Sequence, residues 1–139
     1  MALVNQSADA DLDLSTAQLA PQISPLRAGE DLDAISPCRI ATGALSGETA
    51  GLVYMSNGAA ATEAANFDGF NPKKAKRGEA VELFGPGTRM KYSDGELTPG
   101  RKLYIGGQKG RLDDAATTGD AVGVAKTINQ NDIRITRFV

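Results

Sequence analysis

The side chains that could carry chemistry are carboxylates and lysines, because the sequence has no histidine and one cysteine, Cys38. Without imidazole, the usual general base, the histidine-dependent catalytic triads and any zinc site not built from carboxylates are excluded within one chain. The best carboxylate pair is Asp113-Asp114, since neighbouring acids can act as acid and base or bind a cation. It lies among turn-forming residues, where aspartates commonly bond their own backbone. We therefore interpret this pair, and Glu30-Asp31 with Asp33, as structural, and expect no enzymatic activity, metal or cofactor.

Two further motifs suggest anion binding. The glycine-rich Gly106-Gly-Gln-Lys-Gly110 lacks the Gly-Lys-Ser/Thr that opens a helix in a phosphate-binding loop, and it leads into another strand, so we predict a hairpin. The densest basic cluster consists of Lys73, Lys74, Lys76 and Arg77. Phe67 and Phe70 lie nearby, which would suit single-stranded nucleic acid. Because the net charge is −2 and the pI about 5.1, we favour a loop that is solvated or faces an acidic patch, and expect no nucleic-acid partner.

The charge is unevenly distributed along the chain. Residues 1–33 carry six acids against Arg27 alone, whereas the remainder carries fourteen basic and eleven acidic residues. An acidic arm on a mildly basic body suits docking, although a charged tail that only keeps the protein soluble fits equally. No apolar run approaches the roughly 18–20 residues that span a bilayer, and no signal-peptide pattern is present, so we expect no membrane partner and synthesis in a cytoplasm.

Short strands joined by tight turns are the elements that position these groups. In the C-terminal part the predicted strands contain residues 103–105, 111–112, Val122 with Val124, and Ile133 with Ile135. Further strands are predicted at residues 38–41, 52–56 and 88–92, and Asp94-Gly95 predicts a two-residue hairpin into residues 96–97. Residues 59–65 form a short helix or a loop, which Phe67 and Phe70 anchor to the body. The predicted core residues are Leu103, Tyr104, Ile105, Val122, Val124, Ile133 and Ile135.

The fold predicted from these patterns is all-β: a small β-sandwich or β-barrel (β-tulip-like) body with an extended N-terminal arm. Residues 1–25 form the arm, since their leucines are too sparse for a core, and residues 26–139 form the all-β domain. Ser15 and Gln18 have capping-box spacing and Pro21 would end a helix near Ala20, so at most two helical turns are expected in the arm.

The order of phrases G-x-x-L-Y, turn, G-x-L, loop, G-D-x-V-G-V-A, turn, D-I-x-I resembles the C-terminal half of head decoration (cement) proteins of tailed bacteriophages. The resemblance extends over roughly residues 26–136. It implies a protein made in the host bacterial cytoplasm that binds the outer capsid surface of the virion as a homotrimer. There it would staple neighbouring subunits of the major capsid protein and stabilise the head. The residues we predict to contact the capsid or the trimer are Leu12, Leu14, Leu19, Ile23, Phe67, Phe70, Lys73, Lys74 and Phe138.

Other functions fit parts of the sequence. The chain could belong to a tail or fibre-base module of a virion, to a host-encoded β-barrel binding module, or to an enzyme with carboxylate-only chemistry. A biotinyl or lipoyl carrier is suggested by residues 76–83 and by Arg89-Met-Lys-Tyr92. A carrier, however, needs its lysine at an exposed hairpin tip, and the predicted tip here is Asp94-Gly95.

Overall fold

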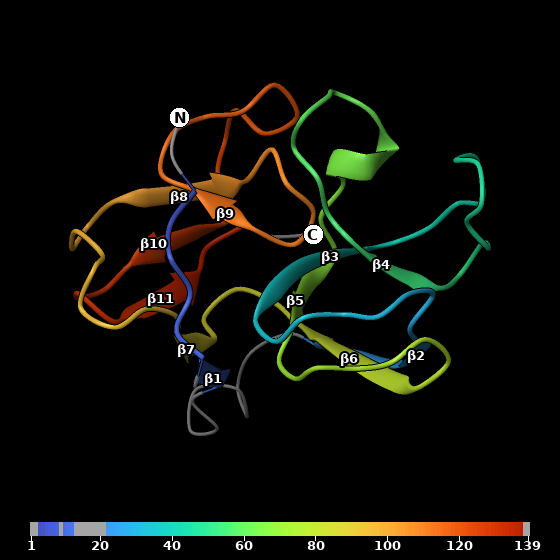
Figure 1. The fold of residues 1–139 in the computed structure, drawn as a ribbon, viewed down its shortest axis with the longest axis horizontal. Coiled ribbons are helices and arrows are strands. Elements are labelled where there is room, and N and C mark those ends of the chain that lie inside the picture. Colours follow the sequence, from blue (N-terminus) through green and yellow to red (C-terminus); the bar gives the residue numbers. More distant parts are fainter. Residues whose placement is uncertain (1–2, 9, 13–21, 138–139) are drawn as a thin grey trace.

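The computed structural model describes residues 3–8, 10–12 and 22–137 (Figure 1). Strands account for 35% of the structure and helix for 2%, in two antiparallel sheets of which one is a curled half-barrel, so the all-β prediction is confirmed. The strands are β1 (Asp11–Leu12), β2 (Gln22–Arg27), β3 (Ser36–Ile40), β4 (Val53–Met55), β5 (Gly69–Asn71), β6 (Ala80–Phe84), β7 (Arg89–Lys91), β8 (Lys102–Ile105), β9 (Leu112–Asp113), β10 (Ala125–Thr127) and β11 (Asp132–Ile135). A single 3-10 turn, Glu63–Ala65, lies within the predicted helix-or-loop stretch.

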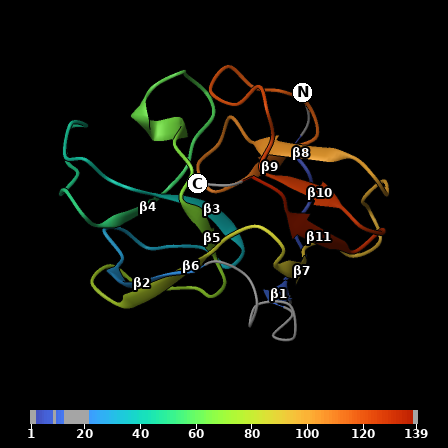
Figure 2. The ribbon, with the colours of Figure 1, turned by 180° about the vertical axis from the view of Figure 1, so that it is seen from behind.

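The two sheets form two lobes that lie side by side in opposite views (Figures 1 and 2). The strand order is β1-β7-β11-β10-β8-β9 in the six-stranded sheet and β2-β6-β5-β3-β4 in the five-stranded sheet. A parallel bridge between Ala28 and Val53 brings the end of β2 beside the start of β4. The Gly29 N–H also donates to the Val53 carbonyl at 2.8 Å, so the five-stranded sheet curls back on itself.

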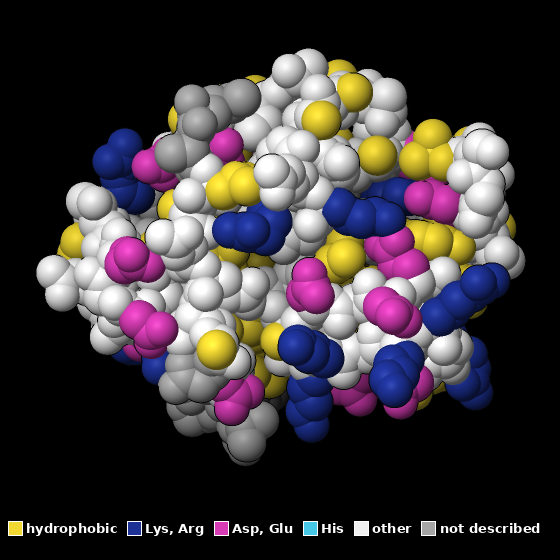
Figure 3. All heavy atoms as spheres, viewed as in Figure 1, with side chains coloured by type: hydrophobic (Ala, Val, Ile, Leu, Met, Phe, Trp, Pro, Cys, Tyr) yellow, Lys and Arg dark blue, Asp and Glu magenta, His cyan; other side chains and the backbone are white. Residues whose placement is uncertain are grey.

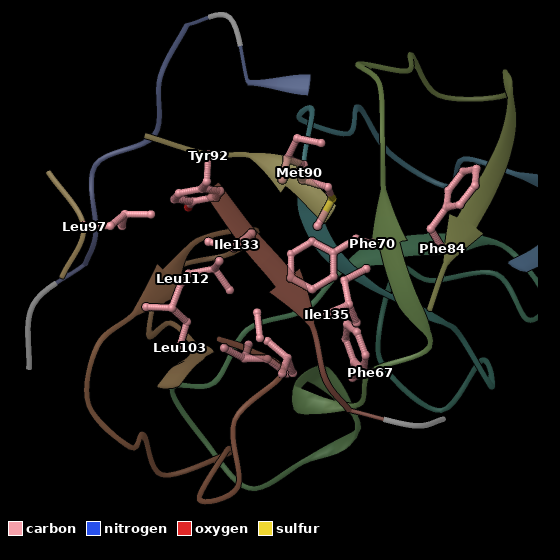
Figure 4. Close-up of a cluster of buried hydrophobic side chains, with 14 residues drawn as sticks. Phe67, Phe70, Phe84, Met90, Tyr92, Leu97, Leu103, Leu112, Ile133 and Ile135 are labelled. Carbon is pink, nitrogen blue, oxygen red and sulfur yellow. The ribbon is translucent and has the colours of Figure 1, made fainter. Parts of the chain in front are cut away.

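The buried apolar side chains form two clusters, one between the lobes and one inside the five-stranded lobe. In the first, Phe70 of β5 and Phe84 of β6 join side chains of the six-stranded sheet, so this cluster lies between the two sheets (Figure 4). Its other main members are Ile35, Phe67, Met90, Tyr92, Leu97, Leu103, Ile105, Leu112, Val124, Ala125, Ile133 and Ile135. The second cluster belongs to the five-stranded lobe and contains Ala28, Leu32, Cys38, Val53, Met55, Val81 and Leu83.

The predicted hairpin at residues 106–110 joins β8 to β9. Ile105 pairs with Leu112, and the Gly106 N–H donates to the Arg111 carbonyl at 2.7 Å. Gly110 has φ +73°, and a Cβ there would lie 2.5 Å from the Met55 sulfur. Only glycine therefore fits the turn without displacing its neighbour.

The structure corrects the prediction that Val122 is a core residue. Val122 is 67% exposed, and strand β10 begins only at Ala125. The buried Asp120 carboxylate accepts hydrogen bonds from the N–H groups of Val122 (3.0 Å), Gly123 (2.9 Å) and Ile105 (2.9 Å). The aspartate thus holds a turn where alternation alone suggested a strand. Tyr104 is only half-buried. The remaining predicted core residues are buried: Leu103, Ile105, Val124, Ile133 and Ile135.

Replacing Asp120 with asparagine should lower the free energy of unfolding by about 2 kcal/mol. An amide has one acceptor oxygen, so a buried backbone N–H would face an NH₂ group instead of an acceptor. Urea denaturation measures the change. Asp114→Asn in the neighbouring loop is the matched control, and an equal loss of stability in both variants would contradict the role assigned to Asp120.

The predicted Asp94-Gly95 hairpin is wrong. The partners of β7 are β1 and β11, and residues 96–97 are not a strand in the structure. Instead, the N–H groups of Tyr92 and Ser93 both donate to the Asn131 carbonyl, at 2.8 and 3.0 Å. The edge of β7 that a hairpin would use is therefore occupied by strands distant in the sequence.

The described part of residues 1–25 lies on the body of the same chain. Strand β1 pairs with β7, and the Val4 N–H donates to the Leu112 carbonyl at 3.0 Å. Strand β2 pairs with β6, and the proposed boundary at residue 26 falls inside it. The helical turns expected at residues 15–20 lie outside the described residues.

Candidate functional site

Phe67 and Phe70, which we predicted to contact the capsid or the trimer, are core residues in the structure. They are 7% and 0% exposed, and their rings pack edge to face with centroids 5.5 Å apart. Each is part of the cluster between the sheets (Figure 4). Because neither ring is presented to a partner, both leave the set of proposed contacts. Stacking of nucleic-acid bases on them is ruled out in this conformation for the same reason.

The remaining apolar contact candidates all belong to the terminal segments. Leu12 in β1 is half-buried and packs against the cluster between the sheets. The backbone of Ile23 pairs with Leu83 within the β2–β6 ladder, and its side chain is outside the described part. Leu14, Leu19 and Phe138 also lie outside the described residues.

Lys73 and Lys74 are exposed and lie on the connection between β5 and β6. They line an open groove of about 570 Å³ together with Pro25, Asn71, Pro72, Ala75, Glu79, Ala80, Val81 and Glu82. The Asn71 amide donates to the Lys73 carbonyl and, at 2.9 Å, to the Asp33 carbonyl, which fixes the start of the connection. These hydrogen bonds hold in place the backbone that carries Lys73 and Lys74 along the groove.

The connection is also held further along. Leu32 and Ala75 exchange two backbone hydrogen bonds, of 2.7 and 3.1 Å. The Arg77 N–H donates to the Asp31 carboxylate at 3.0 Å. Acidic and basic side chains are interspersed over this lobe (Figure 3). The groove thus offers a mixed polar surface rather than a purely cationic one.

Three of the carboxylates considered for chemistry, those of Asp113, Glu30 and Asp31, accept hydrogen bonds from backbone N–H groups. The buried Asp113 accepts from the Ala115 N–H at 3.0 Å, a bond to its own loop. Glu30 accepts from the Met55 N–H at 2.9 Å and forms an ion pair with Lys109. Within the described residues, no group of three or more His, Cys, Asp or Glu side chains is arranged to hold a metal ion. Among the same residues, none of the helical segments has the length and hydrophobicity needed to cross a membrane.

Arg39 is the centre of a buried ion cluster that was not predicted from the sequence. Arg39 is 2% exposed, and its guanidinium donates to both carboxylate oxygens of Glu48, at 2.8 and 2.5 Å. A Glu63 oxygen lies 3.8 Å away, and the guanidinium carbon lies 5.6 Å from the centroid of the Tyr54 ring. The one available signal was a charged residue within an otherwise uncharged strand, Ser36–Ile40.

The cluster connects β3 to two loops. Burial disfavours the charge of Arg39, but its hydrogen bond to Glu48 and the charges of Glu48 and Glu63 outweigh burial and raise the pKa of Arg39. The hydrogen bond from Arg39 lowers the pKa of Glu48 more than burial raises it. Both groups are therefore charged at neutral pH. The pair attaches the loop that contains Glu48 to strand β3.

Cys38 should react very slowly with thiol reagents in the native protein. The side chain is fully buried in β3, and burial raises its pKa to about 12, so almost no thiolate exists at neutral pH. Ellman's reagent, added with and without urea, provides the measurement. A native rate equal to that of the unfolded chain would contradict the burial of this thiol.

No protein family, characterised protein or solved structure matches this chain with significant similarity.

Proposed function

We propose that this chain is a structural protein that binds the outer surface of a tailed-phage head and staples subunits of the major capsid protein. The observation that carries the proposal is the position of the segment that resembles decoration proteins. Three of its phrases fall on β8, β9 and β11, and the fourth, residues 119–125, is the turn that leads into β10. These four strands are neighbours in the six-stranded sheet. The order of the phrases is thus matched by one contiguous block of the fold.

Attachment to the capsid would use exposed residues. Among the contact residues predicted from the sequence, Lys73 and Lys74 are exposed and line a groove, which is the capsid contact that we propose. A homotrimer would present three such grooves, and repetition of weak contacts on one particle strengthens attachment by avidity. In this proposal the protein acts without a catalytic step, a cofactor, nucleic acid or a membrane, and it is located on the outside of the virion.

Co-sedimentation with heads assembled from the major capsid protein encoded beside this chain tests the proposal. The protein should bind expanded heads as a trimer, and unexpanded heads should bind much less because their subunit arrangement differs. Lys73→Gln combined with Lys74→Gln should weaken binding, while Arg101→Gln, an exposed cation on the other lobe, serves as the control. Failure to bind expanded heads would refute capsid decoration.

The alternative is a tail or fibre-base component of the virion. Mass spectrometry of separated heads and tails distinguishes the two, since a tail component would be recovered with tails alone.

A further inference from the structure

A row of four cations crosses the outer face of the six-stranded sheet. The strand register places Lys102 of β8 opposite Lys126 of β10, Lys126 opposite Arg134 of β11, and Arg134 opposite Arg89 of β7. Because adjacent strands lie about 4.8 Å apart, the four residues form a continuous line about 14 Å long. We call these four residues the cationic row.

The cationic row faces away from the core. In each strand, the residue that follows the cation is buried. These buried residues are Leu103 in β8, Thr127 in β10, Ile135 in β11 and Met90 in β7. Successive side chains of a strand point to opposite faces, so the row lies on the outer face. Lys102, Lys126 and Arg134 are exposed, and Arg89 is half-buried.

Like charges that face each other directly across neighbouring strands oppose folding. Arg89 is compensated by Asp132, whose carboxylate accepts from the guanidinium at 2.6 and 3.0 Å. For Lys102, Lys126 and Arg134, no side-chain ion pair or hydrogen bond is found within the described part of the chain. An anionic partner would therefore relieve a repulsion that the isolated chain retains.

The surface at this row is hollowed. A groove of about 540 Å³ is lined by Arg89, Lys126 and Arg134 together with Gly87, Thr127, Ile128 and Thr136. Ile128 is 39% exposed, which adds an apolar contact beside the charges. A ligand that carries both carboxylates and side chains with apolar parts fits this combination better than a simple inorganic anion.

We propose that the cationic row binds an extended acidic segment of another protein, with carboxylates on alternate residues. Alternate side chains of an extended chain point to one side and lie about 6.6–6.8 Å apart, so three carboxylates match the length of the row. Each cation can then form a charge-assisted contact. This binding does not depend on whether the partner is a capsid subunit.

The surroundings of the row favour a short acidic segment over nucleic acid. Two residues further along β7, Lys91 lies opposite both Asp132 and Asp11, so carboxylates lie beside the row. These acids lie beside the row and confine the cationic surface there to one line of side chains, so a polyanion that spreads over the sheet would meet them. The net charge of −2 also opposes general polyanion binding.

The test measures binding of a fluorescein-labelled peptide in which Asp and Ala alternate, by fluorescence anisotropy at low salt. The expected result is that Lys126→Gln combined with Arg134→Gln weakens binding about tenfold, since two charge contacts are lost. Arg27→Gln combined with Arg77→Gln removes the same charge from exposed positions of the five-stranded lobe and should leave the affinity unchanged. A peptide with the same number of Asp residues in one block should bind less tightly.

The outcomes separate this proposal from its competitors. Equal weakening by the two double variants would overturn it, because binding would then reflect net charge alone. Tighter binding of a single-stranded DNA oligonucleotide of equal charge would indicate a nucleic-acid surface instead. Self-association that the Lys126→Gln/Arg134→Gln variant abolishes would assign the row to a second copy of this chain. The same variant should unfold at an equal or higher temperature than the wild type, and a large loss of stability would show a structural role.

Discussion

Replacing Phe70 with alanine should lower the free energy of unfolding by about 4 kcal/mol, the largest effect that we expect from a single substitution. Phe70 is 0% exposed and belongs to β5, yet its ring lies in the cluster between the two sheets. Its truncation would leave a cavity between the lobes as well as remove buried apolar area. Urea denaturation monitored by circular dichroism measures the change.

Val122→Ala is the informative control for Phe70→Ala. Val122 is 67% exposed, so its truncation should change stability by less than about 0.5 kcal/mol. From the sequence alone, the expectation would be the reverse, with Val122 in the core and Phe70 at a contact. Unchanged stability of Phe70→Ala together with lost self-association or lost capsid binding would restore that earlier expectation.

Replacing Glu48 with alanine should destabilise the protein by about 3 kcal/mol. The substitution removes both hydrogen bonds to the Arg39 guanidinium, which is 2% exposed, and leaves a buried charge with only Glu63 at 3.8 Å. Differential scanning calorimetry should show a correspondingly lower unfolding temperature. Glu82→Ala, an exposed acid in β6, is the matched control, and a similar loss in both variants would refute the importance of the buried pair.

The contribution of Glu48 should also depend on pH. Arg39 lowers the pKa of Glu48 from its model-compound value of 4.5, so the folded state binds this proton less tightly than the unfolded state. The stabilisation that the Glu48 carboxylate provides is therefore complete above pH 4.5, the pKa of an unperturbed glutamate. It is lost as the pH falls through the lower pKa of Glu48 in the folded state. In Glu48→Gln, which cannot ionise, the difference from the wild type should shrink below that pH. A constant difference down to acid pH would contradict the assigned shift.

Local patterns predicted the strands well where short-range geometry decides the structure. The β8–β9 hairpin follows from its glycines, and the alternation in β8 and β11 correctly places Leu103, Ile105, Ile133 and Ile135 inside. Val122 was misplaced because one side chain, that of Asp120, imposes a turn on a segment whose apolar spacing is typical of a strand. Side-chain hydrogen bonds of this kind leave no trace in hydrophobic periodicity.

Long-range pairing was beyond the reach of the sequence. Nothing local to Asp11 and Leu12 indicates that they pair with Lys91 and Met90. The sequence predicts two roles for Phe67 and Phe70, an anchor to the body and a contact with a partner, and the packing of the two sheets shows that both side chains are interior. The cationic row likewise arises from register, since its four residues come from separate strands.

The order of strands in the two sheets implies an order of events during synthesis. The five-stranded sheet uses strands up to Phe84, whereas β11, which ends at Ile135, lies in the interior of the six-stranded sheet. About 50 residues separate these points. At a synthesis rate of about 5–20 residues per second, the six-stranded sheet is therefore completed roughly 3–10 s after the last strand of the five-stranded sheet is made. During that interval Phe70 and Phe84 lack the side chains that cover them in the finished cluster. During this interval the nascent protein presents an aromatic face, and recovery of soluble protein should improve when a holding chaperone covers that face.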